Sequence, residues 1–118
     1  MPRVSVIIPT HERAAVLGRA VSSVLAQTWT DFELVVVDDG STDATPAVLA
    51  GFSDPRLKGI RRENKGVSAA RNAGIAATSA PWIALLDSDD YWMPDKLSKQ
   101  LNGSDRKSTR LNSSHEPL

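Results

Sequence analysis

Short apolar runs alternate with longer amphipathic segments along the first hundred residues of the chain. Residues 4–8 and 32–37 are almost wholly apolar and rich in β-branched side chains, which is typical of strands covered on both faces of a sheet. Between them, over residues 13–27, apolar residues recur at the spacing of one helical face. The pattern therefore predicts a strand, a helix and a second strand, in that order.

The same alternation continues further along the chain. Residues 57–61 and 82–86 predict two more strands, and residues 68–77 predict an alanine-rich helix in which Gly74 allows close approach to a sheet. Strand–helix alternation of this length predicts an α/β protein with a parallel, doubly wound sheet and right-handed crossovers. The length of 118 residues suits one domain.

Capping chemistry predicts where the shorter helices begin. Ser41 or Thr42 can cap a helix that runs through residue 49, and Ser68 can cap the alanine-rich helix. Pro94 suits the first turn of a helix that runs through residue 101.

Composition excludes several classes of partner. The chain has 14 basic and 14 acidic residues, so no net field favours nucleic acid or an anionic membrane. It has no cysteine, which excludes disulfides and thiolate metal sites. The apolar runs fall far short of the ~20 residues that span a bilayer. We expect a cytoplasmic protein, soluble or peripheral at the inner face of the membrane, with no nucleic-acid partner and no transmembrane segment.

The last segment departs from this pattern. Residues 105–115 have no hydrophobic period, and they resemble the translation of a common sequencing-library adapter. A native polar tail is the alternative, but such scars are excluded from fold reasoning. We expect the folded domain to lie within residues 1–104, followed by a disordered, non-native tail over residues 105–118.

Three carboxylates follow the predicted strand at residues 82–86. Asp87, Asp89 and Asp90 lie within four residues, and like charges this close repel one another unless a cation neutralises them. Carboxylate oxygens are ligands that suit Mg²⁺ or Mn²⁺. An acidic turn that only caps the next helix is the alternative. Their place directly after an apolar strand favours a divalent-metal site.

Other polar clusters follow the first two strands. In an open parallel sheet, ligands bind outside the carboxyl ends of the strands. Residues 9–12 lie at one such end, and Asp38 and Asp39 lie at another, with Asp39 predicted to face a ribose or base and Asp38 to support it. Arg71, near the start of a helix, suits phosphate oxygens. His11 is predicted to be a structural or rim histidine.

These clusters, in this order, resemble the family 2 glycosyltransferases of the GT-A fold. The resemblance covers residues 3–101 and rests on residues 4–10, 22–28, 33–43, 64–66 with 70–74, and 86–90. It implies that residues 1–104 are the incomplete nucleotide-sugar-binding part of such a domain, with a Rossmann-like sheet truncated after the D-x-D motif. Such a sheet binds a nucleotide-diphosphate sugar, often UDP-linked. It also implies metal-dependent hexosyl transfer with inversion to an acceptor hydroxyl, as in cell-wall or polysaccharide biosynthesis. His11-Glu12 replaces the Tyr-Asn common in the family, which affects base stacking and selectivity.

The resemblance also implies roles for single residues. The implied donor-binding residues are Pro9, Thr10 and Glu12 at the base, Asp39 at the nucleoside, Arg71 near the base or diphosphate, and Asp87 and Ser88 of the D-x-D motif, while Asp87, Asp89 and Asp90 are the implied metal ligands. The family's general base lies C-terminal to this motif. We therefore assign no catalytic residue here, and we expect donor or metal binding without sugar transfer.

Two alternatives belong to other classes of protein. A non-catalytic nucleotide- or Mg²⁺-binding regulatory module, such as a receiver-like domain, also has acidic residues at strand ends. It would require a lysine on a late strand, and none precedes the tail. A nicotinamide-binding domain would require G-x-G-x-x-G after the first strand, and residues 9–13 contain no glycine.

Overall fold

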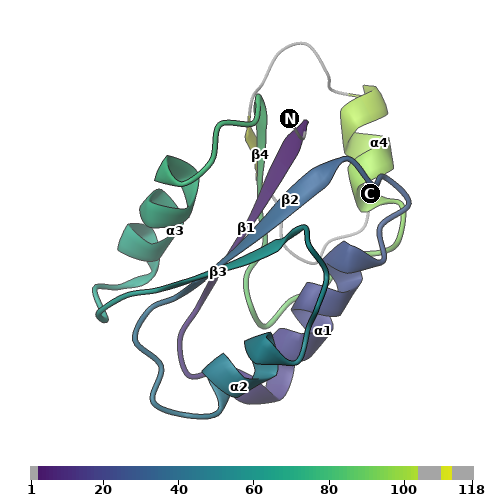
Figure 1. Ribbon diagram of the computed structural model, residues 1–118. Helices are drawn as coiled ribbons and strands as arrows, with labels where there is room; N and C mark the ends of the chain where they lie inside the picture. Colours follow the sequence, from purple (N-terminus) through teal and green to yellow (C-terminus); the bar gives the residue numbers. More distant parts are fainter. Residues whose placement is uncertain (1–2, 104–109, 113–118) are drawn as a thin grey trace.

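The computed structural model describes residues 3–103 and 110–112, and it is an α/β sheet structure (Figure 1). The elements of the described residues are, in chain order, β1 (Val4–Thr10), α1 (Ala14–Leu25), β2 (Phe32–Asp38), α2 (Thr45–Ala50), β3 (Leu57–Arg61), α3 (Val67–Ala76), β4 (Trp82–Leu85), α4 (Lys96–Gly103) and β5 (Arg110–Asn112). None of the helices in this part of the chain is long and apolar enough to cross a membrane.

The strands pair in the order β3-β2-β1-β4-β5, and every pair is parallel. The chain starts at β1 in the middle, moves outward through β2 to β3, and then crosses back to add β4 on the other side of β1 (Figure 1). The prediction of a doubly wound parallel sheet is confirmed. The order reverses between β1 and β4, and ligands of open α/β sheets bind at such a switch point.

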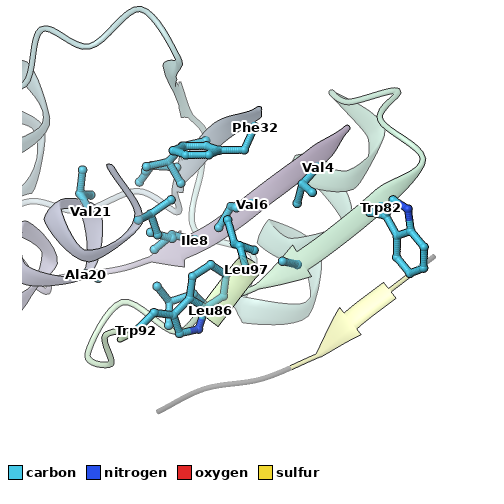
Figure 2. Close-up of a cluster of buried hydrophobic side chains, with 14 of the residues drawn as sticks. Val4, Val6, Ile8, Ala20, Val21, Phe32, Trp82, Leu86, Trp92 and Leu97 are labelled. Carbon is cyan, nitrogen blue, oxygen red and sulfur yellow. The ribbon is translucent and has the colours of Figure 1, made fainter. Parts of the chain in front are cut away.

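Helices cover both faces of the sheet, with α1, α2 and α4 on one face and α3 on the other (Figure 1). All seven residues of β1 are buried, because successive side chains point to opposite faces and both faces are covered. Val4, Val6 and Ile8 join the larger core with α1 and α4, and Ile7 packs under α3. Figure 2 shows the larger core.

Helix starts differ from the predictions made from capping chemistry. Ser41 and Thr42 do not cap α2, which begins at Thr45, because both bond instead to the loop after β1. Ser68 lies inside α3, whose cap is Gly66 at φ +101°. Pro94 precedes α4 rather than occupying its first turn.

The segment expected to lack structure contains one described element. The backbone of β5 pairs in parallel with β4, opposite residues 83–85. An edge strand presents unpaired N–H and C=O groups, so an extended segment of almost any sequence can add to it. At these three residues the expectation of a disordered tail differs from the structure, and the rest of that tail lies outside the described residues.

Gly74 sets the distance between α3 and the sheet. A Cβ atom at this position would lie 2.5 Å from Cγ2 of Ile7 and 3.2 Å from Cγ2 of Val37. Gly74→Ala is therefore expected to lower the free energy of unfolding by about 1–3 kcal/mol through overpacking. Urea denaturation measures this change.

Gly18 in α1 is the matched control, because a Cβ there meets only Cγ1 of Val48 at 3.9 Å. Gly18→Ala is expected to raise the free energy of unfolding by roughly 0.5–1 kcal/mol, since alanine is the better helix former. Equal effects of the two substitutions would contradict close packing at Gly74.

Candidate functional site

A pocket opens at the carboxyl edge of the sheet, where the strand order reverses between β1 and β4. Its volume is about 260 Å³. The lining residues come from the ends of β1, β2 and β4 and from the start of α3: Pro9, Thr10, His11, Arg13, Asp39, Val67, Ala70, Asp87, Ser88 and Asp89. Small-molecule pockets usually have volumes of ~300–1,000 Å³. A drug-sized ligand seated here would therefore extend beyond this pocket.

The three carboxylates after β4 converge on one point. One oxygen atom from each of Asp87, Asp89 and Asp90 lies within 4.8 Å of the others. A tight turn produces this arrangement, because the Asp90 N–H donates to the Asp87 carbonyl at 3.0 Å. Arg71 donates to Oδ1 of Asp87 at 3.1 Å and so offsets part of the negative charge. Converging carboxylate oxygens with charge left over fit a hard divalent cation.

Arg19 of helix α1 holds the acidic loop through a hydrogen bond and a contact with an aromatic ring. Arg19 donates to the Asp89 carbonyl at 3.1 Å, and its guanidinium lies over the Tyr91 ring. Further along, the buried Gln27 bonds to the Met93 carbonyl and the Leu97 amide. Gln27 thereby joins the chain after α1 to the segment that leads from the acidic loop into α4.

Asp39 lines the pocket and also holds the loop between β3 and α3. Its Oδ1 accepts the Lys65 N–H at 3.0 Å and its Oδ2 accepts the Gly66 N–H at 2.9 Å. The residue is 3% exposed, yet each carboxylate oxygen has a second lone pair for a ligand. Asp38 lies beside it outside the pocket lining, where it accepts bonds from the Ser41 amide and the Arg61 guanidinium.

His11 forms part of the rim. Its Nδ1 lies 2.9 Å from the Asp39 carbonyl, which can only accept, so Nδ1 carries the proton. Nε2 is then the acceptor for the Asn64 side-chain amide at 3.0 Å. One ring thereby joins three loops at the pocket edge.

Thr10 presents a polar atom that the described residues do not satisfy. The residue is 3% exposed, and its Oγ1 has no hydrogen-bond partner in the part of the chain that the structure describes. Buried hydroxyls normally have a partner. Because Thr10 lines the pocket, a ligand there could supply that partner.

Three of the residues predicted from sequence, Glu12, Arg71 and Asp90, stand apart from the pocket lining, as far as the described residues define it. Asp90 adds a carboxylate oxygen to the cluster with Asp87 and Asp89, which do line the pocket. Arg71 is connected through its bond to Asp87. Glu12 turns its carboxylate away, toward Thr42 and Asp43. The side-chain hydroxyl and backbone amide of Thr42 hold the pKa of Glu12 below its usual value.

Sequence reasoning missed other residues of the lining. Arg13 belongs to no predicted motif, although it directly precedes the helix that follows β1. Ala70 lies in the segment 70–74, but no role in the site was predicted for it. Val67 is 52% exposed although it is apolar, and it flanks the pocket at the first residue of α3. The signal that could have found Arg13 and Val67 is their position, since helix starts that follow strands face this edge of a parallel sheet.

The fold and the pocket define a doubly wound α/β domain with an acidic cluster at its switch point. The sequence model of Glycosyl transferase family 2 matches residues 5–111. The chain belongs to this family, and its fold is the GT-A fold.

Relatives and solved structures agree with this assignment. "Succinoglycan biosynthesis protein ExoO" from Rhizobium meliloti (strain 1021) is 44% identical over 106 residues, which are 89% of this chain and 30% of the relative. TarS 1–349 from S. aureus in complex with UDP-GlcNAc superposes with a TM-score of 0.82 at 29% identity, over 89% of this chain and 31% of that chain. The mannosyltransferase PcManGT from Pyrobaculum calidifontis, in complex with GDP-Man and Mn²⁺, superposes with a TM-score of 0.71 at 28% identity, over 77% and 28%.

The chain thus spans about a third of the length of these proteins. Their names support polysaccharide synthesis and nucleotide-sugar binding as the activities of its relatives. Membership of this family also disfavours the regulatory-module alternative raised from the sequence.

Asp39 is expected to be the main support of the β3–α3 loop. Asp39→Asn places an amide NH₂ against the N–H of Lys65 or Gly66, which leaves donors facing each other. The free energy of unfolding is expected to fall by about 1–3 kcal/mol, and amide hydrogen exchange at both residues is expected to accelerate. The control is Asp31→Asn, an exposed site. Unchanged hydrogen exchange at these amides in the Asp39→Asn variant would show that Asp39 does not hold the β3–α3 loop.

Proposed function

We propose that this chain forms the donor-binding part of a glycosyltransferase that transfers a hexose from a nucleotide-diphosphate sugar, UDP-linked, to an acceptor hydroxyl. The observation that carries the proposal is the meeting of Thr10 and Asp39 with the acidic loop at one pocket. Similarity to the UDP-GlcNAc complex of TarS supports the donor class.

The proposed donor site divides by chemistry. Pro9 and Thr10 contact the base, with the unsatisfied hydroxyl of Thr10 as a hydrogen-bonding group. Asp39 accepts from the nucleoside with its remaining lone pairs. Ser88 and Asp87 face the ribose side, and Arg71, already beside Asp87, contributes positive charge for the diphosphate.

Asp87, Asp89 and Asp90 are the proposed ligands of a Mg²⁺ or Mn²⁺ ion. Their convergence fits such an ion, and the Mn²⁺ complex of the mannosyltransferase PcManGT supports it. A bound divalent ion would offset the charge that grows on the leaving diphosphate. The turn bond from Asp90 to Asp87 and the bond from Arg19 of α1 to the Asp89 carbonyl would hold the loop in place for such an ion.

The proposed reaction is one displacement at the anomeric carbon with inversion. A general base must take the proton of the acceptor hydroxyl. We assign this base to the part of the relatives that this chain does not match, and we therefore propose that these 118 residues bind donor without transferring sugar. We place the enzyme in the cytoplasm, at or near the inner face of the membrane, with polysaccharide as the product class.

UDP together with Mn²⁺ is expected to stabilise the chain against heat. Ligand at 100 times its Kd stabilises the folded state by about 2.7 kcal/mol, which differential scanning fluorimetry detects as a rise in Tm. NAD or acetyl phosphate, the ligands expected of the alternative classes, should leave the Tm unchanged. Stabilisation by acetyl phosphate and none by UDP with Mn²⁺ would reverse the assignment.

Asp89 is the cleanest test of the metal site, because it is exposed and its side chain supports no other described contact. Asp89→Ala is expected to weaken Mn²⁺ binding by at least about tenfold, since losing even the partners of metal ligands costs about 10–100-fold. Calorimetric titration with Mn²⁺ measures this change.

Asp95→Asn is the matched control for Asp89→Ala, because Asp95 lies six residues further along and pairs with Lys99. It should keep the affinity for Mn²⁺. Equal affinity of the Asp89→Ala variant and the unsubstituted chain would exclude Asp89 as a ligand.

A further inference from the structure

Glu12 joins the loop after β1 to the loop after β2. Its Oε1 accepts the N–H groups of Thr42 and Asp43, both at 3.0 Å, and its Oε2 accepts the Thr42 hydroxyl at 2.7 Å. In return, the N–H of Glu12 donates to Oγ of Ser41 at 2.8 Å. We call these four residues, Glu12, Ser41, Thr42 and Asp43, the Glu12 clasp.

Asp43 extends the clasp to two helix starts. Its Oδ2 accepts the N–H of Ala14, the first residue of α1, at 3.2 Å, and its Oδ1 accepts the N–H of Thr45, the first residue of α2, at 2.9 Å. Because Glu12 binds the backbone N–H of Asp43, it fixes the residue that orients both helices.

The backbone of Glu12 is strained. Its φ is +54°, and it is the one non-glycine residue with positive φ in the described part of the chain. Such a conformation costs of order 1–3 kcal/mol and persists where the surroundings determine it fully. The four hydrogen bonds of Glu12 supply that determination. Strained residues of this kind cluster at functional sites.

The clasp lies directly behind the pocket. Thr10 and His11 precede Glu12, Arg13 follows it, and all three line the pocket. On the other loop, Asp39 lines the pocket two residues before the clasp begins at Ser41. Glu12 itself faces away from the lining within the described residues. Its bonds therefore connect the two loops that supply one side of the pocket.

We propose that Glu12 is a positioning residue for the nucleotide, which sets the Thr10–Arg13 rim against Asp39 and does not itself touch the donor. This role rests on the proposed function. It differs from the role that the resemblance implies for Glu12, in which the side chain lines the base pocket. It also gives a structural role to Glu12, which together with His11 replaces the Tyr-Asn common in the family.

The two roles of Glu12 respond differently to substitution. Glu12→Ala removes the three hydrogen bonds that the Glu12 carboxylate accepts and leaves the bond from its backbone N–H to Ser41. Glu12→Gln keeps an oxygen that accepts the Thr42 and Asp43 amides, and its NH₂ can donate to the Thr42 hydroxyl, so the clasp is rescued. A carboxylate that contacted the donor by its charge would not be rescued by glutamine.

Calorimetric titration of the 118-residue chain with UDP in saturating Mn²⁺, well below the Tm of each variant, is the test. Glu12→Ala is expected to weaken UDP binding about tenfold, because it removes hydrogen bonds of the clasp. Glu12→Gln restores those bonds and is expected to weaken UDP binding by less than about threefold. The affinity for Mn²⁺ alone should not change in either variant. Glu63→Ala, which removes an exposed carboxylate from the facing β3–α3 loop, should bind UDP like the unsubstituted chain.

A double-mutant cycle with Thr42 separates positioning from direct contact. Thr42 is exposed and lies outside the pocket lining. Thr42→Val can therefore change the affinity for UDP only through the clasp. We expect Thr42→Val to weaken UDP binding about threefold, and the Glu12→Ala/Thr42→Val pair to match Glu12→Ala alone at about tenfold. Independent effects would multiply to about thirtyfold.

Three results would overturn the role of Glu12. They are equal loss of UDP affinity in Glu12→Gln and Glu12→Ala, multiplicative effects in the cycle, and a fall in Tm with no change in UDP affinity. If the unsubstituted chain does not bind UDP in the presence of Mn²⁺, the proposed function fails, and this role fails with it.

Discussion

The structure depends on β1 lying in the middle of a parallel sheet with both of its faces buried. All seven of its residues are shielded from water. Its register aligns Thr10 with Asp38, so β1 and β2 end together, while β4 ends at Leu85 opposite Ile7 and leads into the acidic loop at the same edge. The polar residues that follow these strands therefore lie together at this edge of the sheet. The pocket lies at this edge, where the strand order reverses between β1 and β4.

Charge at this edge is arranged in two different ways. The carboxylates of Asp38 and Asp39 accept hydrogen bonds from Arg61 and from backbone N–H groups, so they hold the neighbouring loops in place. The carboxylates of Asp87, Asp89 and Asp90 after β4 converge on one another, and one of them, Asp87, forms an ion pair with Arg71. The first arrangement stabilises the walls of the site, and the second leaves negative charge available for a cation.

Loops at this edge hold one another through polar contacts rather than through apolar packing. His11 bonds to the loops after β2 and β3, Asp39 bonds to the loop after β3, and Glu12 bonds to the loop after β2. Such contacts are directional, so they fix geometry where a nucleotide would require it. They also explain how a site made of loops can be ordered while it stays open to solvent.

Sequence predicted the order of the elements through α4, the parallel sheet and the family. It also predicted that Asp39 and the acidic loop lie at the same edge of the sheet. Buried strands read as apolar runs, and the carboxyl ends of parallel strands must share an edge whatever the details. Sequence could not reveal that Glu12 faces Thr42 and Asp43, or that Ser41 bonds to the loop after β1 instead of capping α2. Those outcomes depend on which side-chain oxygen meets which backbone N–H across about thirty residues of chain, and only the folded arrangement decides that choice.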